Sequence, residues 1–146
     1  MQPLADDVAL VVVDLQPDFM PGGALPCHEG DAIVPGIDAQ LRSRRYVTVV
    51  ATQDWHPADH SSFAGNHSGA QPFGTVAMPY GEQVLWPDHC VIGSKGAAFH
   101  PGLDLDRADL VLRKGFRREI DSYSAFFEND KSTPTGLAGY LRERGE

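Results

Sequence analysis

Short apolar runs rich in β-branched residues recur along the chain and predict its strands. The runs cover residues 8–13, 46–52 and 109–113. Continuous apolar runs of this length are typical of strands in a parallel sheet that is covered on both faces. The pattern therefore predicts an α/β domain built on a parallel sheet.

Apolar residues three and four positions apart predict two helices beside these strands. One is expected from Asp31 to about Arg44, between the first two runs. Strand, helix and strand in this order form a βαβ unit, whose crossover is right-handed. A second helix is expected to begin at Thr133, which suits the N-cap position, with Gly145 as its C-cap.

Two features of the chain stand apart from this regular pattern. Residues 53–107 are rich in His, Gly, Pro, Ser and Trp, and long loops of this kind are usually functional. The last helix ends at Glu146, where a chain of this pattern would return to the sheet. We therefore expect residues 1–146 to form a single α/β domain that lacks its C-terminal strands.

Composition narrows the class of protein. The formal net charge is −8, which disfavours binding to nucleic acid because phosphate backbones repel an acidic chain. We find no secretory signal and no apolar run long enough to span a membrane. With only Cys27 and Cys90, the chain has no disulfide framework and is expected to be cytoplasmic.

Charged residues stand at the carboxyl ends of two predicted strands. Asp14 ends the first run and Lys114 follows the third. In open α/β sheets, ligands bind outside the carboxyl ends of the strands, so these two side chains could meet at a site. Asp14 could equally cap a turn, and Lys114 taken alone would be an ordinary surface lysine.

A histidine-rich segment suggests a metal site. Asp54 and His56 follow the second run two positions apart, so in an extended segment they point the same way. His60 and His89 follow further along the chain. Carboxylate and imidazole ligands suit zinc, iron or manganese. The alternative is a surface turn in which Asp54 caps a helix.

The remaining candidates are aromatic residues and the two cysteines. Phe19 and Trp86 flank the polar groups in the sequence and could stack on a flat ring, although the sequence alone slightly favours a place in the core for both. Cys27 and Cys90 lack the helix N-terminus and the neighbouring base that a reactive thiol requires. We interpret both cysteines as structural or incidental.

Taken together, these segments resemble the nicotinamidases, which belong to the isochorismatase-like cysteine hydrolases. The resemblance runs in order over essentially the whole chain. It is carried by residues 14–19 (DLQPDF), 52–57 (TQDWHP), 86–90 (WPDHC) and 114–115 (KG). It implies a three-layer α/β/α fold and the hydrolysis of nicotinamide to nicotinate and ammonia, a reaction of NAD metabolism and pyridine nucleotide salvage.

The resemblance also implies a role for individual residues. Asp14 matches the general base of a Cys–Asp–Lys triad, and Lys114 matches its lysine. One divalent ion, with zinc expected ahead of iron or manganese, would be held by Asp54, His56 and His89. His60 is a candidate for an additional or outer ligand.

The substrate pocket follows from the same resemblance. Phe19 and Trp86 match the residues that sandwich the pyridine ring, and Tyr123 matches another residue of the pocket. The implied partner is a small molecule, nicotinamide, without nucleic acid or membrane. A homo-oligomer, or a complementing C-terminal polypeptide, is a further expectation.

One departure from the family pattern concerns the nucleophile. The family's cysteine follows a further strand that residues 1–146 do not contain, and neither Cys27 nor Cys90 matches it. We therefore expect the 146-residue chain alone to be inactive. Two alternatives stay open, namely a hydrolase that uses water on the metal and a metal- or nicotinamide-binding module without activity.

Overall fold

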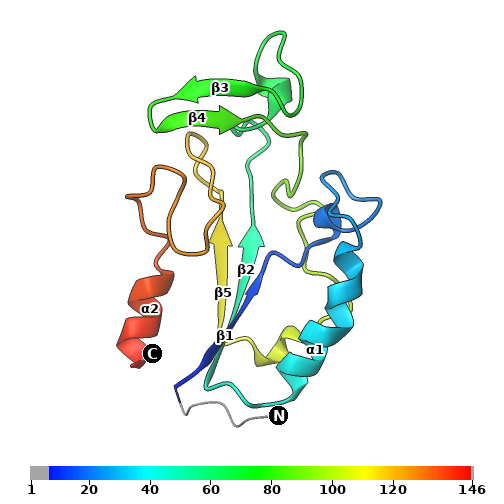
Figure 1. Ribbon diagram of the computed structural model, residues 1–146, viewed down its shortest axis with the longest axis vertical. Helices are drawn as coiled ribbons and strands as arrows, with labels where there is room; N and C mark the ends of the chain where they lie inside the picture. The colour runs from blue at the N-terminus through cyan, green and yellow to red at the C-terminus, as the bar shows by residue number, and fades with distance from the viewer. Residues whose placement is uncertain (1–6, 146) are drawn as a thin grey trace.

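A three-stranded parallel sheet forms the centre of the molecule, for which a computed structural model describes residues 7–145 (Figure 1). Its strands are β1 (Ala9–Val13), β2 (Thr48–Asp54) and β5 (Leu110–Lys114), in the order β1-β2-β5. Every residue of the central strand β2 is buried, as expected for an apolar run that is covered on both faces. The predicted parallel sheet is confirmed.

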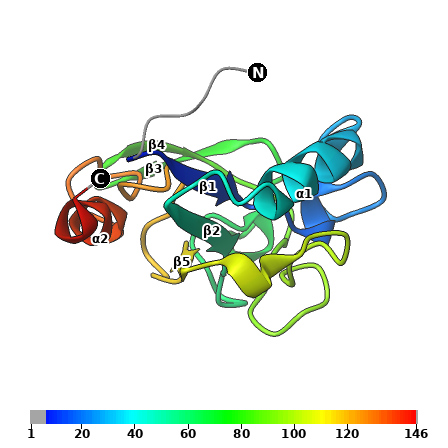
Figure 2. The ribbon, with the colours of Figure 1, turned by 90° about the horizontal axis from the view of Figure 1, so that it is seen from below.

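Two helices cover opposite faces of this sheet (Figure 2). They are α1 (Val34–Arg42) and α2 (Leu137–Arg144). On the α1 face, Val12 and Val49 belong to one apolar cluster with Leu41. On the α2 face, Val50 packs with Leu137. The three-layer α/β/α arrangement is therefore confirmed. No helix within residues 7–145 is long and apolar enough to cross a membrane.

The long polar stretch contains a hairpin that the sequence pattern does not predict. Strands β3 (Thr75–Met78) and β4 (Gly81–Val84) pair antiparallel and lie beyond the carboxyl ends of the main sheet (Figure 1). Each strand has only four residues, most of them at least partly exposed. Such short strands carry no apolar run, and this is why the pattern fails to show them.

The helix boundaries differ from the expectation at both N-termini. A 3₁₀ turn precedes α1, and α2 begins four residues later than Thr133. The Thr133 hydroxyl donates to the Asp130 carboxylate in a turn, and Gly136 then adopts a left-handed conformation with φ 104°. Gly145 is left-handed at the end of α2, which confirms the C-cap.

The 3₁₀ helices are η1 (Pro17–Phe19), η2 (Gly30–Ile33), η3 (Ala64–Asn66) and η4 (Leu105–Arg107).

Candidate active site and metal centre

The carboxyl ends of the three parallel strands meet at one cavity. Asp14 directly follows β1, Asp54 is the last residue of β2, and Lys114 is the last residue of β5. The register places Asp54 opposite Lys114 on adjacent strands. All three side chains line a cavity of about 230 Å³. Its other lining residues are Phe19, Leu25, Trp86, His89, Asp121, Ser122 and Tyr123.

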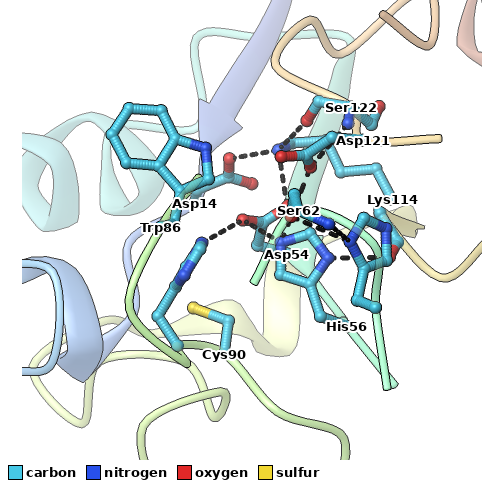
Figure 3. Close-up of polar contacts among 12 residues, drawn as sticks. Asp14, Asp54, His56, Ser62, Trp86, Cys90, Lys114, Asp121 and Ser122 are labelled. Atoms are coloured by element: carbon cyan, nitrogen blue, oxygen red, sulfur yellow. Dashed lines mark hydrogen bonds and ion pairs between the residues drawn. The ribbon is translucent and has the colours of Figure 1, made fainter. Parts of the chain in front are cut away.

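Lys114 lies between the two carboxylates (Figure 3). Its ammonium is 2.7 Å from Asp14 Oδ2 and 2.9 Å from Asp54 Oδ1, and it also donates to the carbonyl of Ser122 at 2.7 Å. Burial lowers the pKa of Lys114, but the charges of Asp54 and Asp14 outweigh it and hold that pKa above its usual range. Lys114 therefore acts as a fixed positive charge and not as a base.

Asp14 is a partly buried carboxylate with a raised pKa. It sits in a left-handed conformation with φ 52° as the chain leaves β1, and its Oδ1 accepts a hydrogen bond of 2.6 Å from the Thr52 hydroxyl. Burial raises the pKa of Asp14, and the neighbouring charge of Lys114 offsets only part of that rise. A carboxylate whose pKa lies closer to neutrality is a stronger general base.

Asp54, His56 and His89 are buried and face one another. Asp54 Oδ2 is 3.1 Å from His56 Nε2 and 3.6 Å from His89 Nε2. Burial raises the pKa of Asp54, but hydrogen bonds with the two imidazoles and the charge of Lys114 outweigh it and hold that pKa well below its usual range. The contact between Asp54 and His56 confirms that the two side chains point the same way.

Both imidazoles turn Nε2 toward the Asp54 carboxylate. His56 Nδ1 is 2.7 Å from the Gly115 carbonyl, and His89 Nδ1 is 2.8 Å from the Pro87 carbonyl. Because a carbonyl oxygen can only accept, each Nδ1 carries a proton, and Nε2 is the nitrogen that each ring can offer to a metal ion. Two such nitrogens and a carboxylate oxygen all lie within 4.8 Å of one another, a donor set that fits a divalent cation.

Gly115 is needed to hold His56 in this position. Its φ is +69°, and a Cβ atom there would lie 2.4 Å from Cε1 of the His56 ring. No larger residue could therefore follow Lys114 without moving the imidazole. The Lys–Gly pair thus supplies the ion-paired Lys114 and leaves room for the imidazole of His56.

His60 lies beside this set, with both of its ring nitrogens occupied. Nδ1 accepts the Ser62 backbone N–H at 3.1 Å, so the proton is on Nε2, which is 3.2 Å from the Ile120 carbonyl. His60 nevertheless belongs to a second group of ligand atoms within 4.8 Å of one another, formed with His56 and Asp121. This geometry favours a supporting position for His60 over direct metal ligation.

The three aromatic residues from the sequence analysis line the cavity. Phe19 lies on η1 with its ring centroid 5.7 Å from that of His89. Trp86 and Tyr123 are 6.2 Å apart, centroid to centroid, and Trp86 Nε1 donates to the Tyr123 hydroxyl at 3.1 Å. Phe19 and Trp86 are partly exposed to the cavity, which argues against a purely structural role in the core.

The two cysteines do not engage the Asp14–Lys114 pair. Cys27 is exposed on a loop, whereas Cys90 is buried with its sulfur 4.0 Å from the Gly96 carbonyl. Burial, together with neighbouring carboxylate charges, raises the pKa of the Cys90 thiol, which keeps it unreactive. In the part of the chain that the structure describes, neither thiol is hydrogen-bonded to Asp14 or Lys114.

Sequence reasoning missed three polar residues of this site. Thr52 precedes Asp54 by two positions in one strand, so the period of two that pairs Asp54 with His56 could have identified it. Gln16 is fully buried and bonds to the Asp54 backbone through both ends of its amide. Asp121 lies on an irregular loop, where no spacing signal exists.

Comparison with known proteins identifies relatives of this chain. The Isochorismatase domain model matches residues 8–145. A curated nicotinamidase of Acinetobacter baylyi is 58% identical over 141 residues, which cover 97% of this chain and 65% of that protein. The chain thus spans slightly less than two thirds of this relative's length.

Solved structures of similar proteins superpose on this chain. An Acinetobacter baumanii nicotinamidase pyrazinamidease superposes with a TM-score of 0.91 and 53% identity, over 97% of this chain and 67% of that one. A pyrazinamidase of Pyrococcus horikoshii in complex with zinc has a TM-score of 0.67 and 36% identity, over 94% of this chain and 64% of that one.

Proposed function

This chain belongs to the isochorismatase family, and from that premise we propose that the whole protein hydrolyses nicotinamide to nicotinate and ammonia. One observation carries the proposal. Asp14 and Lys114, 2.7 Å apart, line the same cavity as Asp54 and His89. These two residues and His56 form the candidate metal site, called the metal set below. The curated and solved relatives with nicotinamidase names support the choice of substrate.

The proposed substrate would lie between Phe19 and Trp86. Their rings border the cavity and could stack on the two faces of a pyridine ring. Asp54, His56 and His89 would hold a divalent ion, most simply zinc, which supplies a Lewis acid for the pyridine nitrogen. The carboxamide would then extend toward Asp14 and Lys114, where the reaction takes place.

The proposed chemistry proceeds through a thioester. Asp14 accepts the proton of a cysteine thiol, and the sulfur attacks the carboxamide carbon while the nearby Lys114 ammonium stabilises the developing negative charge. Asp14 then returns the proton to the departing nitrogen, which leaves as ammonia. Water adds to the thioester with Asp14 again as base, and nicotinate and the thiol are released.

The thiol in this scheme comes from the family resemblance. Cys27 and Cys90 are unsuited to the role because one is exposed on a loop and the other is buried and unreactive. We therefore propose that a cysteine outside residues 1–146 provides it in the whole protein. The cytoplasmic location and an oligomeric or complementing partner stay predictions.

A second candidate is hydrolysis by water activated at the metal set. It is favoured by one observation, the lack of a thiol partner for Asp14 within residues 7–145. Treatment with iodoacetamide separates the two routes in the whole protein. The thioester route predicts loss of activity on alkylation, whereas the metal route predicts that activity survives.

The proposed function is tested by ammonia release from nicotinamide. In the whole protein, Asp14→Asn should lower kcat by about 10²- to 10⁴-fold, because the amide cannot accept the thiol proton. Asp31→Asn, at an exposed position, is the matched control and should leave kcat unchanged. If the unsubstituted protein releases no ammonia, or if Asp14→Asn retains full activity, the proposal is wrong.

A further inference from the structure

Asp121 is a buried carboxylate whose role the proposed mechanism does not explain. Its residue is only 2% exposed, and it lies on the loop that follows β5. Its Oδ1 accepts the Ser122 backbone N–H at 2.8 Å, and its Oδ2 is 3.5 Å from Nε2 of Gln83. Within residues 7–145 no lysine or arginine forms an ion pair with this carboxylate.

The nearest group that could link Asp121 to the site is His56. Asp121 Oδ1 is 3.7 Å from His56 Nε2, the nitrogen that would bind the metal (Figure 3). Two oxygen atoms from different carboxylates, Asp54 and Asp121, therefore face this one nitrogen. Two carboxylates that converge on one nitrogen repel one another unless positive charge lies between them, either on the ring or as a bound cation.

The formal charges around the cavity also favour a bound cation. Three carboxylates, those of Asp14, Asp54 and Asp121, line the cavity with one ammonium, that of Lys114, so with neutral imidazoles the group carries a formal charge of −2. Uncompensated buried charge is strongly unfavourable. A single divalent cation beside neutral imidazoles brings the formal charge to zero. The charge of Asp121 is needed for this balance.

We propose that Asp121 is a second, charge-balancing carboxylate of the metal centre, which tightens binding of the ion through a water molecule without being one of its three protein ligands. Asp54, His56 and His89 form one group of ligand atoms, and Asp121 belongs to the adjacent group that shares His56. His60, the third member of that adjacent group, has both ring nitrogens in hydrogen bonds. The Asp121 carboxylate is therefore the group there that can accept a hydrogen bond from a water ligand of the ion. The inference rests on the metal site of the proposed function.

The test measures Zn²⁺ binding and does not depend on catalysis. Chelator-treated protein is titrated with Zn²⁺ in competition with an indicator chelator. Asp121→Asn removes one negative charge and keeps the size of the side chain. We expect a loss of Zn²⁺ affinity of about tenfold or more, as for other groups that support metal ligands. A smaller loss overturns the inference.

Two control variants separate the possible failures. Glu128→Gln changes another buried carboxylate of the same loop, one paired with Arg117 and absent from both metal groups, and it should leave the affinity unchanged. His56→Ala should abolish stoichiometric binding. If His56→Ala still binds Zn²⁺ fully, the metal site itself is wrong. If only Asp121→Asn behaves as wild type, the site stands and the inference fails.

A structural measurement keeps the proposal testable should Asp121→Asn not fold. In a crystal structure of the wild-type chain loaded with Zn²⁺, an Asp121 oxygen should lie within hydrogen-bond distance of a water ligand of the ion. An Asp121 carboxylate without such a water would overturn the proposal, and so would direct coordination of the ion by Asp121.

Discussion

Two opposing influences act on the pKa of the Asp14 carboxyl group. Burial raises its pKa, whereas the Lys114 ammonium and the Thr52 hydroxyl favour the ionised form. The net result is a carboxyl group whose pKa is raised yet whose position is fixed by two short contacts. A raised pKa makes the carboxylate a stronger base, and the two contacts keep it in place.

Thr52→Val tests this balance because valine keeps the shape of threonine and loses the hydroxyl. The lost hydrogen bond favours the ionised carboxylate, so its removal should raise the pKa of Asp14 further. In the whole protein, the acidic limb of the kcat/KM profile for nicotinamide should move to higher pH. A hydrogen bond to a charged group contributes about 1.5–3 kcal/mol, so the displacement should be easily measured.

The basic limb of the same profile provides the internal control. Nothing in the substitution alters Lys114, so that limb should stay in place. Displacement of the acidic limb to lower pH, or no displacement at all, would mean that Asp14 does not set it. Thr52→Ser retains the hydroxyl and should restore the wild-type profile.

At the scale of elements, the sequence predicts the site best where regular structure carries it. Asp14, Asp54 and Lys114 interrupt or end apolar strands, so a strand pattern alone places them at one edge of the sheet. Asp121 lies on a loop whose path is set by hydrogen bonds to distant groups, and no periodicity reports such a path. The β3–β4 hairpin was missed for a related reason, since its short, largely exposed strands carry no apolar run.

Gln16 joins the segments that hold the metal set, and no sequence pattern shows this either. Its amide donates to the Asp54 and Ala97 carbonyls at 2.8 Å each and accepts the Asp54 N–H at 2.8 Å. This fully buried side chain therefore ties the segment after β1 to the end of β2 and to the loop near residue 97.

Gln16→Leu should destabilise the fold because leucine has a similar size and cannot make these bonds. The Asp54 N–H would be left buried without a partner, at a cost of about 1–3 kcal/mol for each unsatisfied group. Urea unfolding should show a loss of about 2 kcal/mol or more. Gln71→Leu, at an exposed position, should change stability by less than about 0.5 kcal/mol. Equal stability of the two variants would contradict this account of Gln16.

At the scale of the whole molecule, the described sheet has two open edges, β1 and β5. Apolar side chains stand there: Val13 is 47% exposed and Val111 is 46% exposed. Open strand edges with apolar side chains favour pairing with another chain. The formal net charge of −8 opposes association at low ionic strength, and this repulsion weakens as salt screens it.

We therefore expect the 146-residue chain to self-associate, more strongly at high salt than at low salt. Sedimentation velocity should show a weight-average sedimentation coefficient that rises with protein concentration.

Val111→Lys places a charge on the β5 edge and should reduce this rise, since charged residues block edge pairing. Thr75→Lys adds the same charge to the exposed β3 strand and should leave the association unchanged. A wild-type chain that sediments as a single-chain species at every concentration and salt level would show that the exposed edges do not attract one another. Equal effects of the two lysine variants would instead assign the association to net charge and not to the β5 edge.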